Sequence, residues 1–157
     1  MTKTLLFAGA VALALTTAPL GAVAQDSGKT ATYGEISLSA GFTPDPHRVS
    51  VTAGGSIDAY ADTPLPAECV GKVADAPDFE VTYEAGRLPL VFRTLSSVDT
   101  TLIINGPDGR WHCDDDSYGD GDAEVRFEKP RSGTYDVWIG TFGENMADAT
   151  LLITETP

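Results

Sequence analysis

The chain has 157 residues, a length typical of a single domain. Its ten basic residues face 23 acidic ones, for a net charge of −13; DNA, RNA and anionic lipid are therefore not expected partners, because their binding depends on cations. Two cysteines allow one disulfide and exclude a four-cysteine zinc site or a cysteine-held iron–sulfur cluster.

Residues 1–24 have the pattern of an export signal. Lys3 precedes a short apolar run at 5–15, and small residues at 22–24 offer a cleavage point before Gln25. The apolar run is shorter than the roughly 20 residues of a membrane-spanning helix, so we expect no anchor after cleavage. Cleavage removes Lys3 and no acidic residue, which changes the charge from −13 to −14. We expect a periplasmic or extracellular protein.

A polar leader at 25–31 precedes short runs typical of β-strands, and we expect it to lie outside the packed domain. Gly, Pro and Asp separate the runs, and several alternate in polarity, as where Val81 and Tyr83 flank Thr82. The runs cover residues 32–40, 48–53, 56–61, 79–85, 88–95, 100–106, 110–113, 123–129, 134–142 and 149–155. They predict one all-β domain over 32–157, an antiparallel jelly-roll-like β-sandwich of about nine or ten short strands.

The two cysteines, Cys69 and Cys113, lie 44 positions apart. An exported protein folds in an oxidising compartment, where such a pair is normally bridged. We therefore predict a disulfide rather than a catalytic thiol. In the chain-entropy model, a loop of this length gives a stabilisation of about 4 kcal/mol.

The stretch 99–124 combines a hairpin signal with a run of acidic residues. The turn Asn105-Gly106-Pro107-Asp108-Gly109 separates two strand-like runs. Symmetric pairing about Pro107, uncertain by one place either way, would bring Asp99 beside the run at 114–116. The expected pairs are Ile103 with Trp111, Thr101 with Cys113 and Asp99 with Asp115.

Carboxylates brought together in this way repel one another, by about 4 kcal/mol for a close pair at an effective dielectric of 20. A divalent cation removes that repulsion, and an all-oxygen donor set suits Ca²⁺. The predicted calcium ligands are Asp99, Asp114, Asp115, Asp116, Asp120 and Asp122. The alternative is a solvated acidic loop that prevents edge-to-edge pairing with other chains.

No catalytic constellation is evident in the sequence. Neither His47 nor His112 accompanies a G-x-S-x-G elbow, and phosphate-binding loops of the G-x-x-x-x-G-K-[ST] type are absent. We therefore expect a non-catalytic protein. The alternative is a secreted hydrolase, peptidase- or glycosidase-like, that pairs Asp115 with Asp99 and raises the pKa of one of them.

Two tryptophans, Trp111 and Trp138, suggest a further alternative, a platform for recognising a glycan or a protein. Tyr135, Val137 and Ile139 alternate with Asp136 and Trp138, so one of these two sets must face the core. Core packing is the competing interpretation for these rings.

Residues 76–155 contain a recognisable combination of motifs, which are Asp99, the turn Pro107-Asp108-Gly109, the acidic run 114–116 and the closing strand from Gly133 to Gly140. With these positions, the segment resembles the bacterial pre-peptidase C-terminal domain. The resemblance implies a jelly-roll-like accessory domain of secreted proteases, with relatives that bind Ca²⁺ or extracellular matrix. The version with Cys113 before the acidic run is similar to small secreted proteins of Gram-negative bacteria. It implies a protease, an extracellular protein or a glycan as partner, and leaves segment 33–75 unexplained.

Overall fold

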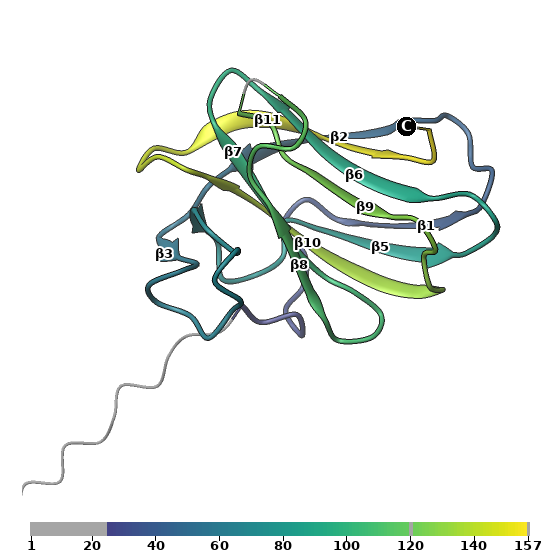
Figure 1. The fold of residues 1–157 in the computed structure, drawn as a ribbon, viewed down its shortest axis with the longest axis horizontal. Coiled ribbons are helices and arrows are strands. Elements are labelled where there is room, and N and C mark those ends of the chain that lie inside the picture. Colours follow the sequence, from purple (N-terminus) through teal and green to yellow (C-terminus); the bar gives the residue numbers. More distant parts are fainter. Residues whose placement is uncertain (1–24, 120, 157) are drawn as a thin grey trace, which may run out of the picture.

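The computed structural model describes residues 25–119 and 121–156, so the predicted export signal lies outside the described residues. Within these ranges the chain forms eleven strands in two sheets, which confirms the all-β prediction (Figure 1). Nothing in these ranges forms a helix long and apolar enough to span a bilayer. The strands are β1 (Glu35–Ser39), β2 (His47–Ala53), β3 (Ile57–Asp58), β4 (Lys72–Val73), β5 (Phe79–Glu84), β6 (Leu90–Ser96), β7 (Thr100–Asn105), β8 (Trp111–Asp114), β9 (Glu124–Phe127), β10 (Gly133–Thr141) and β11 (Ala147–Thr154).

Strand β10 is the centre of the seven-stranded sheet. It pairs with β5 on one edge and β7 on the other, β1 lies beyond β5, and β8 lies beyond β7. Where β5 leaves β10, the short strand β4 continues that edge by pairing Lys72 with Thr141, and β3 follows it. Strands β1 and β5 run parallel, so the expectation of a purely antiparallel sandwich is wrong for this pair. The long connection between them, which includes β2, β3 and β4, makes the parallel pairing possible.

The second sheet has four strands in the order β2-β11-β6-β9, and all its pairings are antiparallel. Alternate residues of both sheets point between them, as the period-2 pattern predicts. The main core is formed by Val51, Ala53, Phe79, Val81, Tyr83, Leu90, Phe92, Leu102, Ile104, Ala123, Val125, Tyr135, Val137, Ile139, Ala149, Leu151 and Ile153.

A second core lies on the outer face of the seven-stranded sheet. The segment from β3 to β4, residues 57–73, covers this face and is here called the flap. Figure 1 shows it to one side of the sandwich. Ala59, Cys69 and Val73 of the flap pack against Ile103 and Trp138 of the sheet. This second core gives a structural role to residues 57–73, a part of the stretch 33–75 that the family resemblance left unexplained.

The disulfide between Cys69 and Cys113 is present, as predicted, and joins the flap to β8. Close approach of the flap also requires Gly140 on β10. A Cβ there would lie 2.4 Å from Thr101 Oγ1 and 2.9 Å from the Lys72 carbonyl oxygen. The disulfide holds the flap on the sheet, and the absence of a side chain at Gly140 allows the two to pack closely.

The leader packs against the domain, contrary to the expectation that it lies outside. Gln25 is buried, and the Asp26 amide donates to the Asp75 carbonyl at 3.2 Å. Lys29 forms an ion pair with the Asp75 carboxylate. The segment therefore belongs to the folded unit, because its backbone and side chains find partners next to β4 that its polar composition did not reveal.

Candidate functional site

The β7–β8 hairpin positions the acidic residues in a different register from the predicted one. Ile103 pairs with Cys113 and Asn105 with Trp111, a shift of two residues. The turn is closed by the Gly106 amide, which donates to the Arg110 carbonyl at 2.9 Å. Gly109, at a φ of 73°, allows this turn. The pairing is therefore centred one residue beyond Pro107.

The acidic loop, residues 114–124, is organised by Asp114 at the end of β8. One carboxylate oxygen of Asp114 accepts the amides of Ser117 at 2.9 Å and Glu124 at 2.8 Å. The other accepts the Ser117 hydroxyl. Asp114 thus ties the start of the loop to its end, a role close to that of a helix-capping or Asx-turn carboxylate.

Asp122 attaches the loop to the β6–β7 turn. Its side chain is buried, and one carboxylate oxygen accepts the Ser96 amide at 3.0 Å. The Thr100 amide in turn donates to the Gly121 carbonyl at 2.8 Å. These contacts draw the loop back over the start of β7, where Asp99 lies.

Asp99, Asp115 and Asp116 lie close enough to influence one another's charge. The pKa of Asp99 is raised, mainly by burial and then by the charges of Asp116 and Asp115. The pKa of Asp115 is raised by burial and then by Asp116 and Asp114. In the described part of the chain, no salt bridge involves Asp99, Asp115 or Asp116. Folding therefore holds three carboxylates together, and no basic side chain of the described residues forms an ion pair with them.

The six predicted calcium ligands fall into three groups. Asp114 accepts hydrogen bonds within the loop and Asp122 accepts one from β6, Asp120 lies outside the described residues, and the other three form the cluster just described. Among the described residues, no group of three or more acidic, histidine or cysteine side chains has a geometry ready to hold a metal ion. The calcium site stays a prediction.

The two tryptophans do not form an exposed platform. Trp138 is fully buried in the second core, and its indole N–H donates to the Asp75 carbonyl at 3.3 Å. Trp111 is half-buried and packs against Trp138, with 5.4 Å between ring centroids. The expected choice between two faces of β10 does not arise, because the flap buries the outer face and the main core buries the inner one.

Two buried carboxylates on or beside β10 were not singled out from the sequence. Asp78 accepts the Ile139 amide at 2.7 Å, and burial raises its pKa to about 7. Asp136 has a pKa raised to about 6 by burial and by the charge of Glu80. Asp136 lies within a strand-like run, where alternation normally places an acidic residue in solvent, and Asp78 lies just before one, so the sequence carried no signal that either is buried.

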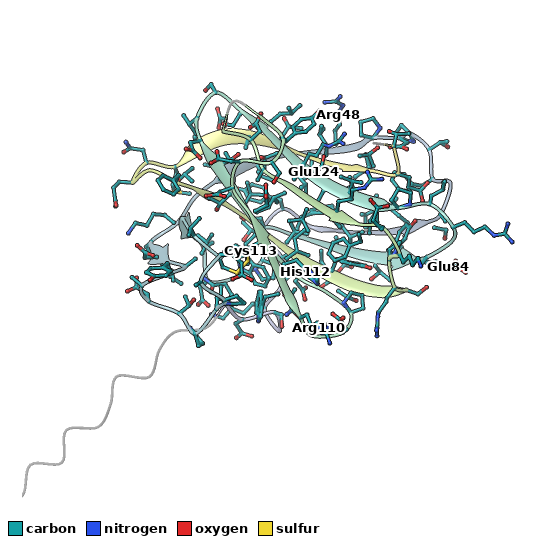
Figure 2. All side chains as sticks on the ribbon, in the orientation of Figure 1. Arg48, Glu84, Arg110, His112, Cys113 and Glu124 are labelled. Atoms are coloured by element: carbon teal, nitrogen blue, oxygen red, sulfur yellow. A yellow bond between two sulfur atoms is a disulfide. The ribbon has the colours of Figure 1, made fainter. Side chains whose placement is uncertain are left out.

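The histidines lie apart and contact aromatic rings. His47 stacks with Phe79 at 6.4 Å, and His112 meets Phe127 edge-on at 4.8 Å. Figure 2 places His112 beside Cys113 on β8.

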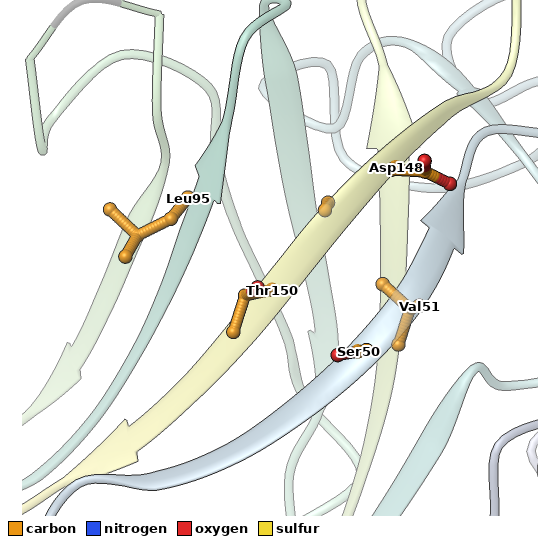
Figure 3. A pocket seen from close by; sticks show the side chains of 6 residues that line it. Ser50, Val51, Leu95, Asp148 and Thr150 are labelled. Carbon is orange, nitrogen blue, oxygen red and sulfur yellow. The ribbon is translucent and has the colours of Figure 1, made fainter.

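The outer face of the four-stranded sheet has an open depression (Figure 3). It lies where Ser50 of β2 pairs with Thr150 of β11, because both side chains are short.

No known protein family and no curated protein sequence matches the chain. Among solved structures, the chain is similar to PliG of Aeromonas hydrophila, a periplasmic lysozyme inhibitor of g-type lysozyme. The identity is 14% and the TM-score 0.37, over 77% of this chain and 96% of that one. A likeness at this level assigns neither family nor function.

Proposed function

We propose that this chain is an exported, non-catalytic β-sandwich binding module that takes up Ca²⁺ at its acidic loop. The observation that carries the proposal is the cluster of Asp99, Asp115 and Asp116. Burial and mutual repulsion raise the pKa values of Asp99 and Asp115. A protein that folds like charges together is relieved of the repulsion when a cation binds between them.

The surrounding contacts support a binding role for the loop. Asp114 and Asp122 hold its backbone through hydrogen bonds, so the remaining carboxylates are close together before the cation binds. Asp120 is the further predicted ligand in the same loop. Ca²⁺ suits such a set, because it accepts six to eight oxygen ligands in flexible geometry.

The disulfide supports export and is linked to the same site. Disulfides persist in oxidising compartments, such as the periplasm or the extracellular medium. Cys113 directly precedes Asp114, so the bond to Cys69 fixes the backbone where the loop begins. We place the protein in the periplasm or outside the cell, in a Gram-negative bacterium.

The partner we propose is a secreted protein, of which a protease is the example implied by the pre-peptidase C-terminal resemblance. Residues 76–155 contribute β5 to β11, the greater part of both sheets. Co-elution of the calcium-loaded protein with an exported protease of the same organism, lost when EDTA is added, would support this proposal. Co-elution unaffected by EDTA would separate the partner from the calcium site.

Calcium titration of EDTA-treated protein tests the site itself. At 100 times the dissociation constant, binding to the folded state raises the free energy of unfolding by about 2.7 kcal/mol. The double variant Asp99→Asn with Asp115→Asn should lose this increase. The matched control is Asp148→Asn, an exposed carboxyl on β11. An unchanged free energy of unfolding in the wild type, or equal calcium responses in both variants, would contradict the proposal.

A further inference from the structure

A small hollow lies where the edge strands of the two sheets face each other, β8 from one sheet and β9 from the other. Its floor is aromatic, with 4.8 Å between the rings of His112 and Phe127 and 5.0 Å between those of Phe127 and Tyr135. Pro107 of the hairpin turn closes one side. Edge-to-face contacts at these distances are stabilising, so the floor is a fixed apolar surface.

The hydroxyl of Tyr135 fixes the chain at the rim of the hollow. It accepts the Arg131 amide at 3.0 Å and donates to the Arg131 carbonyl at 2.8 Å. Both hydrogen-bonding functions of the phenol are therefore used within the protein. They hold the backbone of Arg131, which lines the hollow, in place and do not involve its guanidinium.

Two cations, Lys129 and Arg131, line this hollow, and both are exposed. Within the described residues neither has an ion pair, although acidic residues outnumber basic ones 23 to 10. The cations that do pair with acids are Lys29, Lys72, Arg93, Arg110 and Arg126.

One acidic side chain, Asp108, also lines the hollow. Its carboxylate accepts the Arg110 amide at 3.2 Å and lies 3.8 Å from the Arg110 guanidinium. Arg110 does not line the hollow and offsets this charge only in part, because the pair is exposed. The lining therefore carries the positive charges of Lys129 and Arg131 against the one negative charge of Asp108.

We propose that this hollow binds a carboxylate carried on an apolar or aromatic group, as in a small aromatic acid or the C-terminal residue of a polypeptide. The guanidinium of Arg131 offers a planar fork that matches a carboxylate, and Lys129 adds a second positive charge. The apolar part of the ligand packs against Phe127, His112 and Pro107. This combination of an apolar floor with a few polar groups at its edge is typical of small-molecule sites.

The site is separate from the acidic loop, so it is tested in EDTA without calcium. The probes are N-acetyl-glycyl-phenylalanine as the free acid, the same compound as its amide, and phenylacetate. The chain has two histidines, so NMR follows the His112 ring at the hollow and uses the His47 ring, which stacks on Phe79, as an internal reference. We expect the acid to shift the His112 signals saturably, leave His47 unchanged, and bind at least about fivefold more tightly than the amide.

Phenylacetate distinguishes the two sources of ligand. Binding as tight as that of the peptide acid identifies a small aromatic acid, and weaker binding identifies a polypeptide C-terminus. Both identifications hold only if the peptide acid binds more tightly than its amide.

The variant Arg131→Gln should weaken binding of the acid by about fivefold, which is the upper end of what an exposed ion pair with the ligand carboxylate contributes. It keeps the backbone bonds to Tyr135, so the fold should be unaffected. The matched control is Arg48→Gln on β2, which also lacks an ion pair within the described residues and makes the same change in net charge. Equal weakening by both variants, equal binding of acid and amide, or no shift at His112 would each overturn the proposal.

Discussion

Asp78 sets a testable pH dependence for the stability of the fold. It lies just before β5, and only 2% of its surface is exposed. On that edge of β10, pairing with β5 ends at Val137 and pairing with β4 is at Thr141, so the Ile139 amide between them has no strand partner there. The Asp78 carboxyl accepts this amide at 2.7 Å and fills the gap. The perturbation is Asp78→Asn, which keeps an acceptor oxygen and removes the charge.

The magnitude follows from the raised pKa. Burial lifts the pKa of Asp78 from 3.8 to about 7, although the hydrogen bond from Ile139 opposes the rise. One pKa unit corresponds to about 1.4 kcal/mol, so ionising Asp78 in the folded state costs up to about 4 kcal/mol. Below pH 3.8 both states are protonated and there is no cost. Between pH 4 and 7 the unfolded state loses its proton first, so stability falls as the pH rises, and above pH 7 the full cost is present.

Urea unfolding of the wild type and Asp78→Asn from pH 4 to pH 8 measures this difference. We expect similar stability at pH 4 and a more stable variant at pH 8, by up to about 4 kcal/mol. Asp148→Asn, at an exposed position on β11, controls for the loss of one negative charge. A constant offset between the wild type and Asp78→Asn across the pH range would refute the reasoning, because it would mean that Asp78 titrates alike in both states.

Three other perturbations test the second core and β10. Replacing Cys69 and Cys113 by Ala should lower the free energy of urea unfolding by about 4 kcal/mol, and a loss below about 1 kcal/mol would argue against the chain-entropy account. Gly140→Ala should destabilise by about 1–3 kcal/mol or more, since its Cβ would clash with Thr101 and β4; an unchanged thermal midpoint would contradict this close packing. Asp136→Asn should be more stable than the wild type at pH 8 and nearly equal at pH 4, because burial and Glu80 raise the pKa of Asp136 to about 6; the opposite pH trend in chemical denaturation would be inconsistent with that cause.

Local patterns in the sequence determined the strands and the disulfide. Each predicted run overlaps one strand of the structure, because period-2 alternation and the intervening Gly and Pro act over a few neighbouring residues. The two-residue strand β4 was not predicted, since it is too short to show a period. The Cys69–Cys113 pairing followed because only two cysteines exist.

Tertiary structure alone decided which face each strand buries and which charges meet. Alternation along β10 predicted one buried face, but both Val137 and Trp138 are buried, because a flap distant in sequence covers the outer side. The hairpin register depended on how the turn closes, and Lys129 reaches the same hollow as His112 only through the packing of β8 against β9. These features depend on contacts between segments far apart in the chain, which periodicity within one segment does not encode.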